Sequence, residues 1–194
     1  MKANSPTPDG IIPIEGSGAE NDRDLDIIFG DFISQITGLS RNLCRRRWQE
    51  NPPPQPDRNV DWCALGIVDI EPDINDYKYF QDGIGLTVGF HETLSLLVSF
   101  YGPNATLNAM NLRIGLTLSQ NRIILSEHGM AFMNATNPVR FPELINRLFL
   151  PRTDITLKIR RHEKRVYPIK SAVSSDGVIT AEYVKQSFTT ENIK

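Results

Sequence analysis

The chain has 194 residues, of which 40% are hydrophobic and 23% charged, and its formal net charge is −2 with a pI near 5.9. A chain of this length can form one domain whose core needs no disulfide or metal, and the near-neutral charge argues against a dedicated nucleic-acid binder. No apolar stretch approaches the roughly 20 residues that span a bilayer, and the first residues lack the apolar core of a signal peptide. We therefore expect a cytosolic protein without a membrane partner.

The two ends of the chain differ from its middle. Residues 1–20 are polar and rich in proline and glycine, with a short apolar cluster at Ile11, Ile12 and Ile14. Such a composition cannot bury enough surface to pack alone, so we predict an extended N-terminal arm that lies across a neighbouring subunit. Residues 21–180 form the predicted main domain, and residues 181–194 a C-terminal strand end and tail.

Apolar spacing predicts the helices. Between Asn21 and Thr37 the apolar residues recur at the i, i+3, i+4, i+7 spacing of one helix face, and Gly38 can end that helix. A second helix is predicted to open at Pro103 or Asn104, with one face carrying Leu107, Met110, Ile114 and Leu118. A short helix over residues 121–128 and a helical turn over residues 141–146 complete the set.

Alternation predicts the strands. Residues 92–100, 130–135 and 153–161 read as strands, and in the last of these Ile155, Leu157 and Ile159 face one side. Residues 43–49 read as extended and 51–56 as a stiff proline spacer, residues 61–70 as a strand, and the acidic residues 71–82 as a loop or hairpin tip. Residues 166–173 and 178–188 are predicted to form a hairpin about Asp176-Gly177. The sum is an α+β fold, a mostly antiparallel β-sheet with two or three helices packed on one face.

No catalytic, metal or cofactor site emerges from the residue types. Asp69, Glu71 and Asp73 alternate like the first ligands of a calcium loop, but Ile74 and Phe80 stand where that loop needs glycine and glutamate. The three histidines have no nucleophile beside them, and Cys44 and Cys63 lack zinc-ligand spacing, so we interpret both cysteines as buried thiols. We expect a protein that is not an enzyme and has no cofactor.

Two basic runs leave two interpretations open. One holds Arg41 and residues 45–47, and the other holds Lys158, Arg160, Arg161, Lys164 and Arg165. They are either solvated faces with surface ion pairs, or they meet acidic segments such as residues 71–82 of the next subunit. Separated acidic and basic blocks in a near-neutral chain suit self-association.

Several short motifs, taken in order, resemble a phage neck or tail-terminator family. They are Arg47-Trp-Gln with the proline loop and Trp62, Ser99-Phe-Tyr-Gly-Pro, Leu112-Arg-Ile-Gly-Leu with Gln120-Asn-Arg, Gly129-Met-Ala-Phe, Pro142-Glu-Leu-Ile-Asn, and Arg152-x-Asp154 opening the basic strand to Tyr167. The resemblance covers roughly residues 43–179.

The resemblance implies a structural virion protein of the neck and tail, present in the host cytoplasm during assembly. It implies a small α+β subunit that forms a homo-oligomeric ring, a hexamer, with the head connector or adaptor protein and the tail tube protein as partners. A ring of this kind surrounds the DNA path, so non-specific contact with DNA passing through the channel is also implied.

The predicted subunit interface follows from residue type, because tyrosine, tryptophan and arginine are the usual interface anchors. It consists of Arg45, Arg46, Arg47, Trp48, Tyr101, Asn121 and Arg152. Core packing is an equal alternative for Trp48 and Tyr101.

Two other functions are weighed against the ring. The first is a nucleic-acid-binding module that uses the basic strand 158–165 with residues 45–47. The net charge of −2 argues against this function. The second is a hydrolase or nuclease, for which no convergent set of groups can be assembled.

Overall fold

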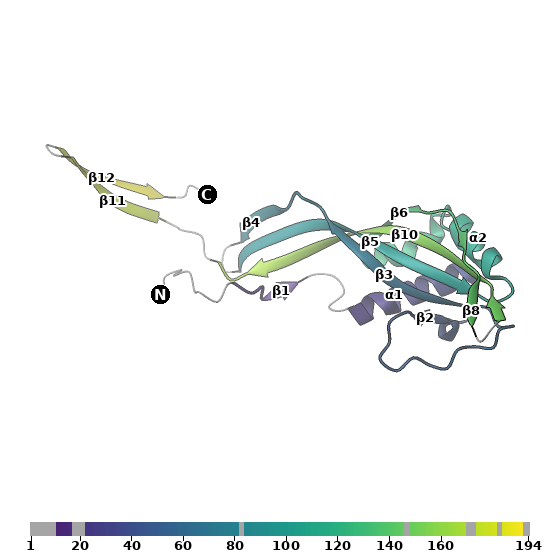
Figure 1. The fold of residues 1–194 in the computed structure, drawn as a ribbon. Coiled ribbons are helices and arrows are strands. Elements are labelled where there is room, and N and C mark those ends of the chain that lie inside the picture. The colour runs from purple at the N-terminus through teal and green to yellow at the C-terminus, as the bar shows by residue number, and fades with distance from the viewer. Residues whose placement is uncertain are drawn as a thin grey trace. The chain divides into compact units, whose positions relative to one another are not determined.

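The computed structural model describes residues 11–16, 22–81, 84–145, 148–169, 174–181 and 184–191. The chain divides into two compact units, a larger one of Ser17–Asp76 and Gly89–Lys164, and a smaller one of Met1–Gly16, Tyr77–Val88 and Arg165–Lys194. The predicted α+β class is confirmed, since strands and helices both build the larger unit (Figure 1). The units are considered one at a time.

The larger unit contains a mostly antiparallel sheet in the order β10-β5-β3-β2. These strands are β2 (Cys44–Arg46), β3 (Trp62–Pro72), β5 (Gly85–Tyr101) and β10 (Arg152–Tyr167), and β2 runs parallel to β3. The short strands β6 (Met130–Ala135) and β7 (Val139–Arg140) pair antiparallel with β10. The strands predicted for residues 92–100, 130–135 and 153–161 are thus confirmed as parts of β5, β6 and β10.

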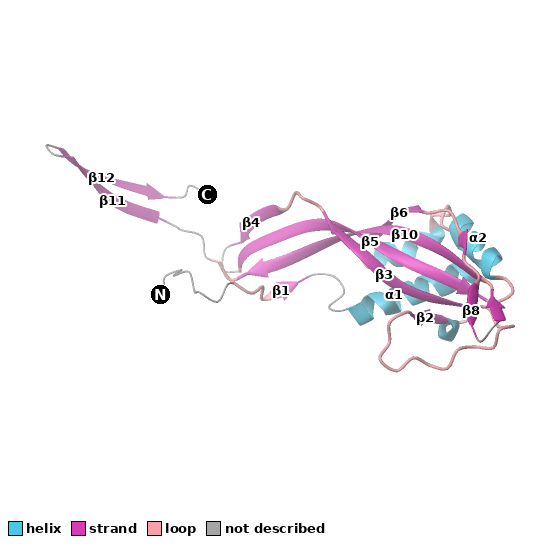
Figure 2. Ribbon diagram, viewed as in Figure 1, coloured by secondary structure: helices cyan, strands magenta, loops and turns pink. Residues whose placement is uncertain are grey.

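The helices pack on one face of this sheet (Figure 2). They are α1 (Asp22–Thr37), α2 (Ala105–Gly115) and α3 (Ile123–Glu127), with short 3₁₀ turns η1 (Arg41–Leu43) and η2 (Gln120–Arg122). Phe29, Phe32 and Ile33 of α1 are fully buried against inward residues of β5 and β10. As predicted, α1 stops before Gly38, whose φ of 75° few other residues tolerate. No helix within the described ranges is long and apolar enough to cross a membrane.

Helix α2 turns a different face to the core from the one that the apolar spacing picked out. Its buried residues are Ala105, Asn108, Ala109 and Leu112, whereas Leu107, Met110 and Ile114 are 57%, 40% and 60% exposed. The two faces lie on opposite sides of the helix, since residues 105, 109 and 112 are about half a turn away from 107, 110 and 114. Small alanines let the helix approach closely, and that close packing outweighed the larger side chains.

Three local predictions were wrong. Within the predicted acidic loop 71–82, Tyr77–Gln81 form strand β4, because the alternating tyrosines Tyr77 and Tyr79 favour a strand over a loop. The predicted helical turn at 141–146 contains strand β8 (Glu143–Ile145), which pairs with β9 (Leu148–Leu150). Cross-strand pairing with a segment outside the turn decided this structure, and residues 141–146 alone do not show that partner.

The third error concerns the predicted hairpin about Asp176-Gly177. These two residues lie within strand β11 (Ser174–Ala181), opposite Thr189 and Phe188 of β12 (Val184–Glu191). Val166 and Tyr167, assigned to the first arm of that hairpin, are instead the end of β10. A two-residue turn signal is local, whereas the register of the hairpin depends on the whole length of both strands.

The smaller unit contains the pair β11 and β12, and strand β4, which pairs with β5. Strand β1 (Glu15–Gly16) pairs with Val166 and Arg165 of β10, so the described part of the predicted arm contacts its own chain. The contact of the arm with another subunit stays a prediction. Residues 1–10 and 17–20 of the arm and residues 182–183 and 192–194 of the predicted tail lie outside the described residues.

Two glycines with positive φ, Gly102 in the turn after β5 and Gly38 after α1, differ in the space that a side chain would have. Gly102 has a φ of 105°, and a Cβ atom there would lie 2.6 Å from Asp61 Oδ1 and 2.7 Å from the Val60 carbonyl oxygen. Gly38 also has a positive φ, but no atom lies within 4 Å of a Cβ built on it. We expect Gly38→Ala to lower the free energy of unfolding by about 1–2 kcal/mol, the cost of the left-handed conformation, and Gly102→Ala by clearly more. Urea denaturation measures both, and equal losses would contradict the proposed clash.

Candidate functional site

Four side chains form a row across the sheet face opposite the helices. Leu94, Leu96, Val98 and Phe100 of β5 point into the core, so Ser99 and Tyr101 point to the other side. The register pairs Trp62 with Tyr101 and Ala64 with Ser99, which places Trp62 on this outer face as well. Arg45 of β2, opposite Ala64, and Arg152 of β10 extend the row on both sides.

The members of this row stack on one another. The rings of Trp62 and Tyr101 lie 4.3 Å apart at an angle of 9°. The guanidinium of Arg45 lies 5.7 Å from the Trp62 ring, and that of Arg152 lies 5.8 Å from the Tyr101 ring. Each arginine is thus within the range of a cation–π interaction. We call Arg45, Trp62, Tyr101 and Arg152 the aromatic row.

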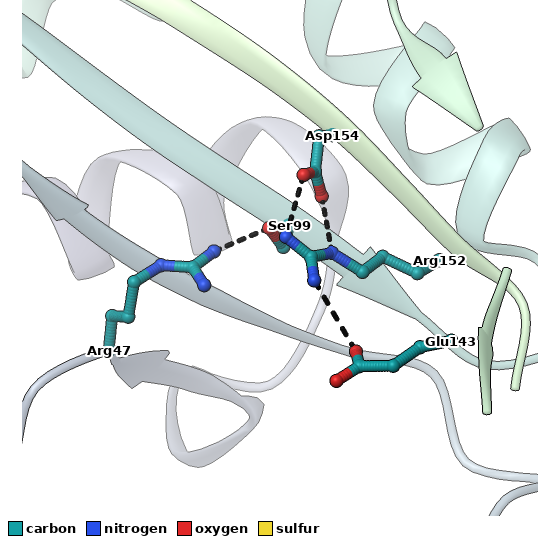
Figure 3. Close-up of polar contacts among 5 residues, drawn as sticks. All are labelled: Arg47, Ser99, Glu143, Arg152 and Asp154. Atoms are coloured by element: carbon teal, nitrogen blue, oxygen red, sulfur yellow. Dashed lines mark hydrogen bonds and ion pairs between the residues drawn. The ribbon is translucent and has the colours of Figure 1, made fainter. Parts of the chain in front are cut away.

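Carboxylates hold Arg152 in place at one end of the row (Figure 3). Its Nε and Nη2 donate to Asp154 Oδ1 and Oδ2 at 2.8 and 2.7 Å, and its Nη1 donates to Glu143 Oε2 at 3.4 Å. The fork to Asp154 is the bidentate geometry that fixes a guanidinium most firmly. The hydrogen bond with Asp154 raises the pKa of Arg152 even further above its usual range, and burial raises the pKa of the Tyr101 phenol.

Arg47 approaches the same face from the end of β2 (Figure 3). Its Nη2 donates to the Ser99 hydroxyl, and its Nε is buried without a hydrogen-bond partner. Ser99 is itself fully buried, so this contact satisfies a polar group that would otherwise be costly. Arg47 therefore stabilises the fold through Ser99 and also lies on the face that carries the aromatic row.

A cavity of about 440 Å³ lies beside the row. Three arginines, Arg45, Arg46 and Arg47, line it together with the aromatic pair, and Glu143 is the one carboxylate among its lining residues. The proline loop contributes Pro52 and Pro53, and Arg45 Nη1 holds that loop by donating to the Pro54 carbonyl at 2.6 Å. We call this cavity the arginine cleft.

Five of the seven predicted interface residues gather here. Arg45, Arg46, Arg47 and Tyr101 line the arginine cleft, and Arg152 stacks on Tyr101. Tyr101 is buried, whereas Trp48 is 62% exposed and does not line the cleft; a Cβ on Gly66 would lie 2.7 Å from its ring. Asn121 lies elsewhere, on η2, where its Nδ2 donates to the Gly115 carbonyl at the end of α2.

Residue type alone did not single out Trp62, Ser99, Glu143 or Asp154 as site residues. A signal was available, because Trp62, Ser99 and the pair Arg152 and Asp154 belong to the motifs of the family resemblance, and these motifs converge on one place. The pairing of Glu143 with Arg152 has no local sequence signal.

The basic strand finds its partners within the same chain. Lys158 Nζ lies 3.0 Å from Glu71 Oε1, and Arg160 pairs with Asp73. The hydrogen bond from Lys158 lowers the pKa of Glu71. Of the two interpretations of this run, pairing with the acidic segment of another subunit is therefore not needed to neutralise Lys158 and Arg160.

The histidines and cysteines form no reactive arrangement among the described residues. Both cysteines are buried and free, and they lie side by side in the register of β2 and β3. A hydrogen bond between the two thiols lowers the pKa of Cys44 and raises that of Cys63. The rings of His91 and His162 lie 4.8 Å apart, and burial lowers the pKa of His162. No group of three or more His, Cys, Asp or Glu within the described ranges could hold a metal ion.

A comparison with protein families matches most of the chain. The family model described as phage neck terminator protein matches residues 23–183. These residues include all of α1 but its first residue, the sheet of the larger unit and the whole aromatic row. No curated protein matches the chain.

Proposed function

The chain belongs to the phage neck terminator proteins, which have a structural role at the phage neck, and on that premise we propose that it forms a closed hexameric ring. In this proposal the ring caps the tail tube and joins it to the head connector, so both of those proteins are its partners. The subunit assembles in the host cytoplasm and acts without catalysis.

The observation that carries the ring is that α2 is apolar on two opposite faces. One face is buried in the core, and the other exposes Leu107, Met110 and Ile114, with the half-exposed Leu118 in the turn that follows. Exposed large apolar side chains that gather on one surface often mark a contact with another protein chain. The second face therefore fits a contact with another copy of the chain.

A second apolar surface supplies the other half of that contact. Leu144 and Phe149 are directly opposite each other in the β8–β9 pair, so they share one face, and they are 61% and 73% exposed. A two-stranded hairpin is at best marginally stable in water unless something covers it. We propose that the hairpin of one copy packs on the exposed face of α2 in the next.

A contact between two unlike surfaces is head-to-tail, and such a contact closes into a ring when its rotation divides the circle evenly. The predicted interface residues around the arginine cleft would then be free for a different neighbour. Hydrophobic burial supplies the affinity between copies, and the polar site supplies selectivity.

Light scattering of the purified chain, with negative-stain images, tests the ring. We expect particles of a single mass, six times that of the chain, with an open centre. If the chain is monomeric alone, the measurement is repeated with purified tail tube protein as a template. A chain that remains monomeric under both conditions, and also with the head connector, would contradict the ring.

The nucleic-acid alternative receives little support from the charges. Lys158, Arg160 and Arg161, the centre of the basic strand 158–165, all pair with carboxylates of the same chain. A phosphate-tracking surface needs cations that are free to replace counterions. Non-specific contact with DNA in the channel remains part of the proposed ring.

A further inference from the structure

The arginine cleft carries more positive charge than the chain itself neutralises. Of its lining residues only Glu143 is acidic, and Glu143 already pairs with Arg152 at the edge of the cleft. Among the described residues no carboxylate lies within ion-pair distance of Arg45 or Arg47, and Arg46 reaches Asp26 only at 3.9 Å. This contrasts with the basic strand, where Lys158, Arg160 and Arg161 pair with carboxylates.

The donors of these arginines are only partly used. Arg45 donates to the neutral carbonyl oxygens of Asn42 and Pro54, and Arg47 donates to the hydroxyl of Ser99 while its buried Nε has no partner. An unpaired buried donor on a charged group is costly to the folded chain. A bound anion would accept from such donors, so the cleft has the chemistry of an anion site.

We propose that the arginine cleft binds an acidic segment of a protein partner, whose carboxylate accepts hydrogen bonds from the guanidinium groups of Arg45 and Arg47. Guanidinium groups match carboxylates in geometry and bind them through paired hydrogen bonds. The apolar sides of Pro52, Pro53 and Trp62 form the wall against which the backbone and the aliphatic part of such a segment lie. A cavity of about 440 Å³ falls within the usual range for sites that enclose a short ligand segment.

The same geometry disfavours nucleic acid in the cleft. Single-stranded nucleic acid binds through bases that stack on free aromatic faces. Here Trp62 is covered by Tyr101 on one face and approached by Arg45, and Tyr101 is likewise covered by Trp62 and approached by Arg152. Neither ring offers a free face to a base. A duplex, whose major groove alone is about 12 Å wide, is also too large for the cavity.

The proposal that the cleft binds an acidic segment does not depend on ring formation. The proposal that this segment belongs to another neck protein rests on the proposed function. A neck terminator meets proteins on both of its sides in the proposed assembly. A selective polar site beside an apolar self-contact lets one subunit distinguish a copy of itself from its other neighbours.

Fluorescence anisotropy with the full chain tests the site. The probe is a labelled short peptide of alternating aspartate and glutamate, compared with the same peptide carrying asparagine and glutamine, and with a labelled single-stranded DNA of mixed sequence. We expect the acidic peptide to bind and the amide peptide not to. Arg45→Gln and, as a second variant, Arg47→Gln should each weaken peptide binding about ten-fold, the loss of a charge-assisted hydrogen bond.

Arg140→Gln is the matched control, since Arg140 lies exposed on β7 and does not line the cleft. It removes the same charge and should leave peptide binding unchanged. Equal losses in Arg140→Gln and Arg45→Gln, or no binding of the acidic peptide to the unaltered chain, would overturn the proposal. Tighter binding of DNA than of peptide, lost in Arg45→Gln, would also overturn it in favour of a phosphate site.

Light scattering of the same samples separates this inference from the ring. Loss of peptide binding in Arg45→Gln with an unchanged assembly supports a cleft that serves a partner other than the next copy. A failure of the unaltered chain to assemble contradicts the ring alone, because peptide binding is measured on whatever assembly state the chain has.

Discussion

Replacing Arg161 with alanine is expected to lower the free energy of unfolding by about 3–5 kcal/mol, because it removes the cation that pairs with the buried carboxylate of Glu92. Arg161 donates from Nε to Glu92, and its Nη1 lies 3.3 Å from Glu163 Oε1. Glu92 and Glu163 are 6% and 4% exposed, so water cannot replace the lost partner. Chemical denaturation measures the loss.

Lys158→Ala is the matched control on the same strand. Lys158 pairs with Glu71, whose side chain is 60% exposed, and an ion pair of this kind contributes at most about 1 kcal/mol. A further variant distinguishes two contributions to the free energy of unfolding. One is the cost of a buried carboxylate without its cation, and the other is the net contribution of the intact ion cluster. Replacing Arg161, Glu92 and Glu163 together with methionine or leucine should restore most of the stability, since buried ion clusters are often no better than apolar packing. A small loss in Arg161→Ala would show that the carboxylates are not buried in solution.

The second large effect concerns assembly. Leu107→Asp combined with Ile114→Asp should abolish the proposed ring while leaving the subunit folded, because both side chains are exposed on α2 and neither touches the core. Burying a large apolar side chain stabilises a contact by roughly 1.5–3 kcal/mol, so losing two weakens each contact by about 4 kcal/mol before the cost of burying charge. Light scattering measures the assembly, and circular dichroism the fold.

Ile27→Asp on α1 provides the control for this double variant. Ile27 is also an isoleucine on a helix surface and is 44% exposed, but it lies outside α2 and the β8–β9 pair. It should assemble like the unaltered chain. Intact rings in the α2 double variant would contradict the proposed contact, and equal loss in both variants would mean that general surface charge, and not the α2 face, governs assembly.

The elements with a strong local period could be predicted from the sequence. Helix α1 and strand β10 each bury one face, so their apolar residues repeat at the helix or strand period, and the confirmed α+β class follows from such patterns. Helix α2 shows where this reasoning ends. Its existence was predictable, but both of its faces are apolar, and the choice between them depends on which one packs closely against α1 and the sheet.

The family resemblance was likewise accessible from the sequence, because it rests on short motifs in a fixed order. The interface residues stay a prediction from residue type. The tertiary structure alone decided that Arg45, Trp62, Tyr101 and Arg152 form one stacked row. They come from four strands far apart in the chain, and their alignment depends on strand order and register. Register is set by non-local pairing, in which a shift of one residue turns every side chain to the other face, and no local pattern carries that information.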